Sequence, residues 1–352
     1  MKATGILLIV CLSTGAHAAE FTAKVQKIGA LTGPAAPVDM RAPDICGTDL
    51  GTMAEIGGRI VFAFGDTFGW RGSLCSRFGP NWRSNAIAYT RDLDPSDGVS
   101  IEGWVTGQNG QAIAVAAGKY EPAFKGEQTR IPTSLLAVGN RLFLHTMSVK
   151  GFADEGGAWL CNSSRFYYSD DEAKTWTPAS TFGDYKSAFN MLALSAQSGA
   201  GNEDGGYAYA IGTACGRFAG ARLARVPVGK VIDPAAWEYF DGKGWSPRRA
   251  DAAEIIKPGV GEGSLIWNAG IQRWMYTTLN ELSSAVELRL AAVPTGPWSD
   301  PIALARLVEF PEAYGAFMTP SWISKDGLTL YFVMSQFGPY NTFVMKAELT
   351  RS

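Results

Sequence analysis

Histidine is almost absent from this sequence, and its scarcity excludes several kinds of site. The 352 residues include two histidines, His17 and His145. Metal centres built from several histidines are therefore excluded, and a Ser-His-Asp triad would depend on His145 alone. His145 lies inside the apolar run 142–147, where a structural role is the favoured interpretation. Any hydrolytic chemistry in this chain has to use carboxylates.

Neither sign of charge is in excess. Lys and Arg number 31 against 33 Asp and Glu, which gives a formal net charge of −2 at pH 7. The sequence has no basic stripe that would favour nucleic acid or an anionic membrane. Beyond the N-terminus, no apolar run is long enough to cross a bilayer. We therefore expect no nucleic-acid partner and no membrane anchor.

Residues 1–18 have the features of a secretory signal peptide. Lys2 is followed by an apolar run over 6–12 and by Ala-His-Ala at 16–18. A basic start, a short apolar run and a small-x-small site are typical of a cleaved signal. Cys11 is not preceded by a small residue, which disfavours a lipoprotein anchor. We expect a single mature domain over 19–352, a monomer, and a secreted or periplasmic location.

Four cysteines remain after the expected cleavage: Cys46, Cys75, Cys161 and Cys215. An even number in an exported protein favours two disulfides. Three pairings are possible, and we favour Cys46–Cys75 with Cys161–Cys215 because each closes a local loop. The spacing does not resemble a zinc site. We expect no cofactor and no catalytic metal, and leave a structural calcium ion open.

Hairpin patterns recur along the chain, with turns near residues 57, 139, 201, 270 and 326. Each hairpin is followed by more strand-like sequence. Five units of three or four strands predict an all-β fold, specifically a five-bladed β-propeller. Residues 21–28 are expected to complete the last blade and close the ring. A pair of β-sandwiches is the alternative architecture.

The first hairpin contains the most informative pair of residues, Asp49 and Asp66. If Gly57 and Gly58 form a two-residue turn, paired residue numbers sum to 115, so Asp49 faces Asp66. Like charges that face each other destabilise a sheet. Such a pair indicates a raised pKa, a bound cation or acid/base chemistry, and glycoside hydrolysis uses two carboxylates. The alternative is that each carboxylate caps turn amides.

Propeller geometry predicts which other residues lie near this pair. The first strand of a blade begins, and the second ends, at the same rim, so Asp49 and Asp66 are expected at one mouth of the central channel. Glu262 could supply a general acid from across the channel, and Glu127 competes for that role. The candidate substrate-binding residues are Arg83, Asn85, Glu127, Thr133, Arg217, Arg289 and Tyr314. The donors could instead pair with acids structurally, and Tyr314 could belong to the core.

Several short stretches together resemble a family of secreted bacterial propellers. They are Gly-Thr-Asp-Leu-Gly at 47–51, Phe-Gly-Asp-Thr-Phe at 64–68, Trp-Arg-Ser-Asn at 82–85, and 131–133, 216–217, 261–264, 294–298, 314–315 and 338–341. This family, long called a domain of unknown function, includes endo-D-arabinanases that cut mycobacterial arabinan. The resemblance implies a five-bladed propeller that hydrolyses arabinofuranosyl linkages, with Asp49 and Asp66 as the best catalytic candidates.

Three functions are consistent with the sequence. The first is an exported, endo-acting glycoside hydrolase whose partner is a polysaccharide. The second is a non-catalytic, carbohydrate-binding propeller. The third is a scaffold stabilised by calcium.

Overall fold

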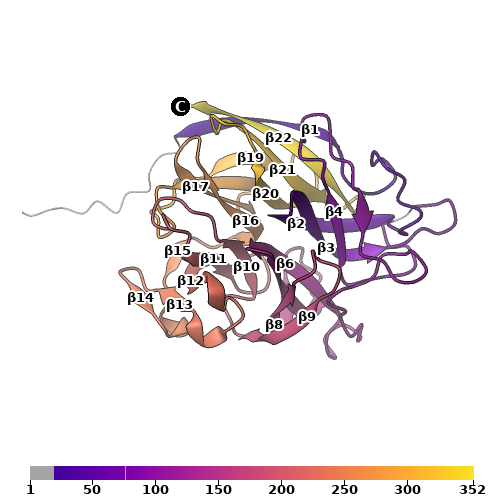
Figure 1. Ribbon diagram of the computed structural model, residues 1–352, viewed down its shortest axis with the longest axis horizontal. Helices are drawn as coiled ribbons and strands as arrows, with labels where there is room; N and C mark the ends of the chain where they lie inside the picture. The colour runs from indigo at the N-terminus through magenta and orange to yellow at the C-terminus, as the bar shows by residue number, and fades with distance from the viewer. Residues whose placement is uncertain (1–19, 76) are drawn as a thin grey trace, which may run out of the picture.

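Five antiparallel β-sheets surround a central axis, so the predicted five-bladed β-propeller is confirmed (Figure 1). The computed structural model describes residues 20–75 and 77–352. The signal peptide expected at residues 1–18 lies outside the described residues. The first strands of the five blades contact one another around the axis. The described residues contain no helix that is long and apolar enough to span a membrane.

Four of the five blades consist of four strands, and the third is larger. Blade 1 contains β2 (Gly47–Ile56), β3 (Arg59–Phe68), β4 (Ala86–Thr90) and β5 (Gly103–Trp104). Blade 2 contains β6 (Thr129–Val138), β7 (Arg141–Phe152), β8 (Trp159–Ser169) and β9 (Thr177–Asp184). Blade 4 contains β16 (Val260–Asn268), β17 (Arg273–Asn280), β18 (Ala285–Ala291) and β19 (Ile302–Arg306).

Blade 3 has extra strands on its outer side. It contains β10 (Met191–Ser195), β11 (Tyr207–Thr213), β12 (Ala221–Pro227), β13 (Glu238–Phe240), β14 (Trp245–Ser246) and β15 (Glu254–Ile256). Three short 3-10 turns accompany them: η1 (Val228–Lys230), η2 (Pro234–Ala236) and η3 (Arg249–Asp251).

Blade 5 closes the ring with strands from both ends of the described chain. It contains β20 (Ala313–Ile323), β21 (Thr329–Gln336), β22 (Asn341–Arg351) and β1 (Phe21–Ala30). Strand β1 pairs antiparallel with β22 from Phe21 opposite Arg351 to Ala30 opposite Phe343. Figure 1 shows β1 in indigo beside β22 in yellow. The prediction that the N-terminal strand completes the last blade is confirmed.

Left-handed glycines set the register of the first hairpin. Gly57 and Gly58 have φ angles of 57° and 71°, as a tight turn with two left-handed residues requires. Met53 therefore pairs with Phe62, as the sequence predicts. Almost all of β2 and β3 is buried, because neighbouring blades cover both faces of the sheet. The paired strands thus carry apolar side chains on both sides.

Hydrogen bonds between neighbouring blades form a closed ring around the axis. In each, a backbone N–H of one blade donates to a side-chain oxygen of the next. The donor and acceptor pairs are Leu135 to Thr52 (3.1 Å), Leu194 to Ser134 (3.0 Å), Trp267 to Gln197 (2.9 Å), Met318 to Ser264 (3.0 Å) and Leu50 to Ser335 (2.7 Å). An inner strand is a sheet edge with unpaired backbone groups. These side chains satisfy that edge and tie each blade to the next.

The central channel has two chemically different ends. A cavity of about 240 Å³ lies at the end where the inner hairpins turn, and the first strands of all five blades line it over 52–55, 134–137, 194–197, 264–266 and 318–320. At the other end each first strand begins and each second strand ends. We call this second end the mouth. It contains Asp49 and Asp66.

Both predicted disulfides are present. Cys46 is bonded to Cys75 and Cys161 to Cys215, with Cα–Cα distances of 5.3 and 6.0 Å. The first bond attaches the loop after β3 to the chain just before β2. The second attaches the loop after β11 to β8, and so joins blade 3 to blade 2. Each disulfide therefore anchors a loop at the mouth.

Candidate active site

The strands that carry Asp49 and Asp66 are irregular where they reach the mouth. The ladder between β2 and β3 shifts register on both sides of Leu50, which pairs with Phe64 instead of the expected Gly65. Leu50 and Gly51 both have positive φ, at 62° and 102°. The prediction that Asp49 and Asp66 form a regular ladder pair is therefore wrong in detail. A bulge of this kind re-aims side chains and is frequent beside active sites.

A register shift at the start of the first strand also occurs in three other blades. First strands change register between Pro132 and Ser134 in β6, between Val260 and Gly263 in β16, and between Tyr314 and Ala316 in β20. Thr133, Glu262 and Gly315 fall within these irregular segments. Of these three residues, Glu262 is the one whose polar side chain joins the acids at the mouth, and a bulge there can re-aim its side chain.

Asp49 is a buried carboxylate whose two oxygens differ. The Tyr314 hydroxyl donates to Oδ2 at 2.7 Å, whereas Oδ1 is buried without a hydrogen-bond partner. Burial is the main cause that raises the pKa of Asp49 to about 7. Repulsion from Asp66, and to a smaller extent from Glu262, adds to the rise, and the Tyr314 and Tyr340 hydroxyls oppose it. Asp49 is therefore suited to hold a proton near neutral pH.

Asp66 is held by donors from two other segments. Trp82 donates its indole N–H to Oδ1 at 2.9 Å, and the Thr129 hydroxyl of blade 2 donates to the same oxygen at 2.5 Å. Burial raises the pKa of Asp66 to about 6, and these two hydrogen bonds oppose the rise. Among the described residues, no cation lies within 4.0 Å of either Asp49 or Asp66. Asp66 is close enough to Asp49 for its charge to contribute to the raised pKa of Asp49.

Glu262 reaches the same place from blade 4, where it is paired with a cation. Arg217 donates through Nε to Glu262 Oε2 at 2.8 Å, and a second nitrogen lies 3.3 Å from Oε1. The same guanidinium lies 3.2 Å from Glu281. It also covers the rings of Trp159 and Tyr314, at 5.3 and 4.9 Å from their centroids. Arg217 thus links Glu262 to the tyrosine that binds Asp49.

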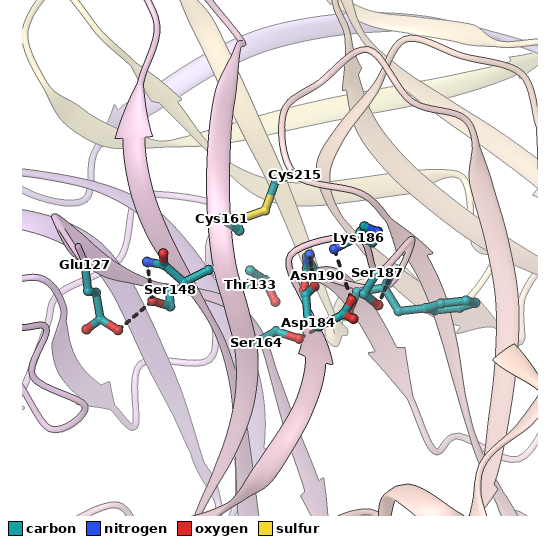
Figure 2. Close-up of a disulfide and its surroundings, with 12 residues drawn as sticks. Glu127, Thr133, Ser148, Cys161, Ser164, Asp184, Lys186, Ser187, Asn190 and Cys215 are labelled. Atoms are coloured by element: carbon teal, nitrogen blue, oxygen red, sulfur yellow. Dashed lines mark hydrogen bonds between the residues drawn. A yellow bond between two sulfur atoms is a disulfide. The ribbon is translucent and has the colours of Figure 1, made fainter. Parts of the chain in front are cut away.

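The position of Arg217 depends on its loop. Its backbone N–H donates to the Gly157 carbonyl at 2.8 Å, and the preceding Gly216 has a φ of 82°. The Cys161–Cys215 disulfide begins this loop (Figure 2). A covalent bond, a backbone hydrogen bond and a left-handed glycine therefore fix where the guanidinium enters the mouth.

Glu127 and Arg83 are buried, and both have partners away from Asp49 and Asp66. Glu127 accepts hydrogen bonds from Arg130 and from the Ser148 hydroxyl, the second at 2.5 Å (Figure 2). Arg83 donates to the Asp44 carbonyl at 2.7 Å. Neither contacts Asp49 or Asp66 through a hydrogen bond or ion pair that the described residues show. Their predicted roles in substrate binding, and that of Glu127 as an acid, stay predictions.

Asn85, Thr133 and Arg289 also have structural partners. Asn85 binds backbone groups of the loop that contains Ala116, and accepts from its N–H at 3.1 Å. Thr133 lies 2.6 Å from Nδ1 of the buried His145. Arg289 donates to the Ser299 carbonyl and pairs with Glu287 on blade 4. The substrate-binding roles of these three residues also stay predictions.

Sequence reasoning missed some residues of this site. Thr129 was not proposed, although it begins the first strand of blade 2 at the same rim as Asp49. Trp159 was not proposed either. Glu281 was expected at the rim, within residues 279–281, but not as a partner of Arg217. The rim segment expected for blade 2 was 131–133, and extending it to residue 129 would have included Thr129. No such signal identifies Trp159, since its contact with Arg217 depends on the loop that follows β11.

Metal ligands do not cluster in the described part of the chain. No group of three or more His, Cys, Asp or Glu side chains within residues 20–75 and 77–352 is arranged to hold an ion. The structure therefore offers no argument for the calcium-stabilised scaffold, which stays an untested alternative.

The raised pKa values predict how stability depends on pH. The folded protein keeps protons on Asp49 and Asp66 that the unfolded chain releases near its ordinary pKa of 3.8. This contribution to the free energy of unfolding is fully present below pH 3.8 and is lost as the pH rises through about 6 to 7. Asp66→Asn stays neutral and should lose less stability than the wild type between about pH 4 and pH 8. Urea unfolding at both pH values measures the difference, and equal losses would contradict the raised pKa.

Comparison with known proteins identifies the family. A family model described as a domain of unknown function (DUF4185) matches residues 38–346. No curated protein gives a significant match. Similar solved structures include a provisionally assigned hydrolase from Bacteroides ovatus ATCC 8483, with a TM-score of 0.61 and 13% identity over 88% of this chain and 87% of that chain.

Two further structures of similar fold are glycoside hydrolases. Zg3597, a family 117 enzyme from Zobellia galactanivorans, has a TM-score of 0.51 and 11% identity over 94% of this chain and 90% of that chain. The catalytic domain of a family 62 α-L-arabinofuranosidase from Coprinopsis cinerea has a TM-score of 0.51 and 9% identity over 94% of this chain and 97% of that chain. At such identities these likenesses show the propeller fold alone. Because the family model spans most of the sequence, this chain belongs to the DUF4185 family.

Proposed function

We propose that this protein is an exported glycoside hydrolase that cuts arabinofuranosyl polymers internally, such as the D-arabinan of mycobacterial-type cell walls. The observation that carries the proposal is the pair Asp49 and Asp66. Two buried acids lie together at the mouth, the described residues place no cation within 4.0 Å of either, and both have a raised pKa. An ordinary structural site would avoid this arrangement, whereas glycoside hydrolysis requires one carboxyl that holds a proton and one that has lost it.

The contacts of the three acids suggest their roles. Asp49 has the higher pKa, about 7, and supplies the proton to the leaving oxygen. Asp66, oriented by Trp82 and Thr129, activates water or attacks the sugar. Glu262 forms an ion pair with Arg217 at 2.8 Å, so its carboxylate already has a cationic partner. Asp49 therefore fits the role of general acid better than Glu262, for which the sequence suggested that role.

The three parts of this proposal, namely the glycoside hydrolase activity, the arabinan substrate and the export, have different support. Some family 62 and family 117 glycoside hydrolases use the same architecture. The arabinan substrate rests on the resemblance of the short motifs that are spread over residues 47–341. Export rests on the N-terminal sequence and is supported by the two disulfides.

The product pattern of the purified protein tests this function. We expect arabinogalactan and lipoarabinomannan to release fragments of several residues from the earliest time points, with a rapid fall in polymer size. Release of single sugars without that fall would contradict internal cleavage. A panel of other polysaccharides serves as the control. Cleavage of another glycan without cleavage of arabinan would contradict arabinan as the substrate.

One observation favours a second candidate, a carbohydrate-binding propeller without activity. Asp49 and Asp66 are only 9% and 8% exposed, so little of either is in contact with solvent. This candidate predicts that the protein is retained by immobilised arabinogalactan but releases no fragments. It also predicts that Asp49→Asn and Asp66→Asn leave that retention unchanged.

A further inference from the structure

Exposed aromatic side chains are confined to the mouth. Seven aromatic residues are exposed in the part of the chain that the structure describes: Phe78, Tyr120, Phe124, Phe152, Tyr185, Phe218 and Phe337. Every one lies in or beside a loop that joins a second strand to a third or one blade to the next. These loops all lie at the mouth end of the blades. A one-sided distribution of exposed rings is typical of a binding surface.

Three of these exposed rings, those of Phe78, Tyr120 and Phe337, belong to one continuous group. We call Phe68, Phe78, Trp82, Tyr120, Phe337 and Tyr340 the mouth aromatic cluster. Ring centroids are 5.2 Å apart for Tyr120 and Trp82, 6.3 Å for Trp82 and Phe68, 5.6 Å for Phe68 and Tyr340, 5.9 Å for Tyr340 and Phe78, and 6.3 Å for Phe78 and Phe337. Phe78 is 54% exposed, while Tyr120 and Phe337 are each 41% exposed.

Two less exposed members of the mouth aromatic cluster, Trp82 and Tyr340, contact the acid pair. Trp82 donates its indole N–H to Asp66 at 2.9 Å. The Tyr340 hydroxyl interacts with the Asp49 carboxylate. The exposed rings of Phe78 and Phe337 pack against Tyr340 in tilted and edge-on contacts, each at 5.9 Å between centroids, and so continue from the acids toward solvent. The cluster is therefore an extension of the candidate active site.

The exposed edge of the mouth aromatic cluster is held in place. The Arg77 guanidinium lies 4.9 Å from the ring centroid of Phe78 and 4.6 Å from that of Phe337. It also donates to the Phe337 carbonyl at 3.5 Å. The Cys46–Cys75 disulfide anchors the loop two residues before Arg77. Rings ordered in advance lose little conformational entropy when a ligand binds.

We propose that the mouth aromatic cluster, through the exposed faces of Phe78 and Phe337, binds sugar residues of the polymer next to the bond at the acid pair. The C–H face of a sugar ring packs on an aromatic face, and the sugar hydroxyls stay in water. This inference rests on the proposed function and extends it, because a site for neighbouring residues gives a polymer an advantage over a short fragment. The occupant is a neutral glycan, which fits the absence of a basic stripe.

Binding measurements on a protein that cannot cleave test the mouth aromatic cluster. Asp66→Asn provides that background, and mycobacterial arabinogalactan is the probe. We expect the added pair Phe78→Ala and Phe337→Ala to raise the Kd at least about tenfold, because central aromatic contacts dominate such interfaces. Tyr185→Ala is the matched control, since Tyr185 is 65% exposed at the mouth but lies outside the cluster. It should leave the Kd unchanged.

The outcomes separate this inference from the proposed function. An unchanged Kd in the double phenylalanine variant, an equal loss in Tyr185→Ala, or no binding of arabinogalactan by the Asp66→Asn protein would each overturn the role of the cluster. A wild-type protein that binds arabinogalactan through Phe78 and Phe337 but never cleaves it would contradict the proposed hydrolase activity. The same result would support the proposed role of the mouth aromatic cluster in binding. Thermal melting of each variant confirms that it is folded.

Discussion

Asp66→Asn is expected to lower kcat on arabinogalactan by about 10³-fold, within the range for loss of a positioned acid or base. The amide keeps the shape of the side chain and an oxygen that can accept from Trp82 and Thr129. It cannot take a proton from water or attack a sugar. Fragment release measured under saturating polymer gives the change in kcat directly.

Stability distinguishes this loss of activity from a folding defect. Near pH 8 the wild type carries a buried negative charge at Asp66, which the amide removes. Asp66→Asn is therefore expected to melt at the same temperature as the wild type or above it. Substitutions in an active site commonly raise stability while they lower activity. Full activity in both Asp66→Asn and Asp49→Asn would reject the catalytic assignment.

Arg217→Met is expected to destabilise the fold by about 3–5 kcal/mol, because removing one partner of a buried ion pair leaves the other charge uncompensated. Glu262 is 5% exposed, and its side chain has Arg217 as its cationic partner. Glu281 would lose the same cation. Urea unfolding at neutral pH measures the change in the free energy of unfolding.

Two further variants test whether the uncompensated charge of Glu262 causes this loss of stability. Adding Glu262→Gln to Arg217→Met should recover part of the lost stability, because the remaining partner is then neutral. Arg141→Met is the matched control, since Arg141 pairs with Asp170 on the surface, where ion pairs contribute little. Equal losses for Arg217→Met and Arg141→Met would contradict the proposed arrangement at the mouth.

Local sequence patterns were sufficient for the architecture. The Gly57-Gly58 turn set the register of the first hairpin correctly as far as Thr52 and Ala63, and the same register returns at Thr48 and Thr67. The recurrence of such hairpins predicted five blades, and the N-terminal strand was correctly assigned to the last one. These features depend on residues close together in sequence or on a repeat that is visible without coordinates. The disulfide pairing was also predictable because each bond closes a local loop.

The detailed geometry of the mouth was harder to predict from the sequence. The bulge at Leu50 and Gly51 breaks the ladder that the turn predicts, and the sequence pattern gives no warning of it. Arg217 and Glu262 were each named as candidates, but their ion pair was not foreseen. Tyr314 binds Asp49 only because closing the ring places blade 5 beside blade 1.

By itself the sequence determined the fold class, the hairpin turns, the disulfide pairs and the presence of two acids near one rim. Those properties follow from local backbone preferences and from apolar periodicity. Only the tertiary structure decided which charges are paired, which acids have a raised pKa and which aromatic rings meet. These depend on burial and on distances between residues far apart in the chain, which exist only once the ring of blades has closed.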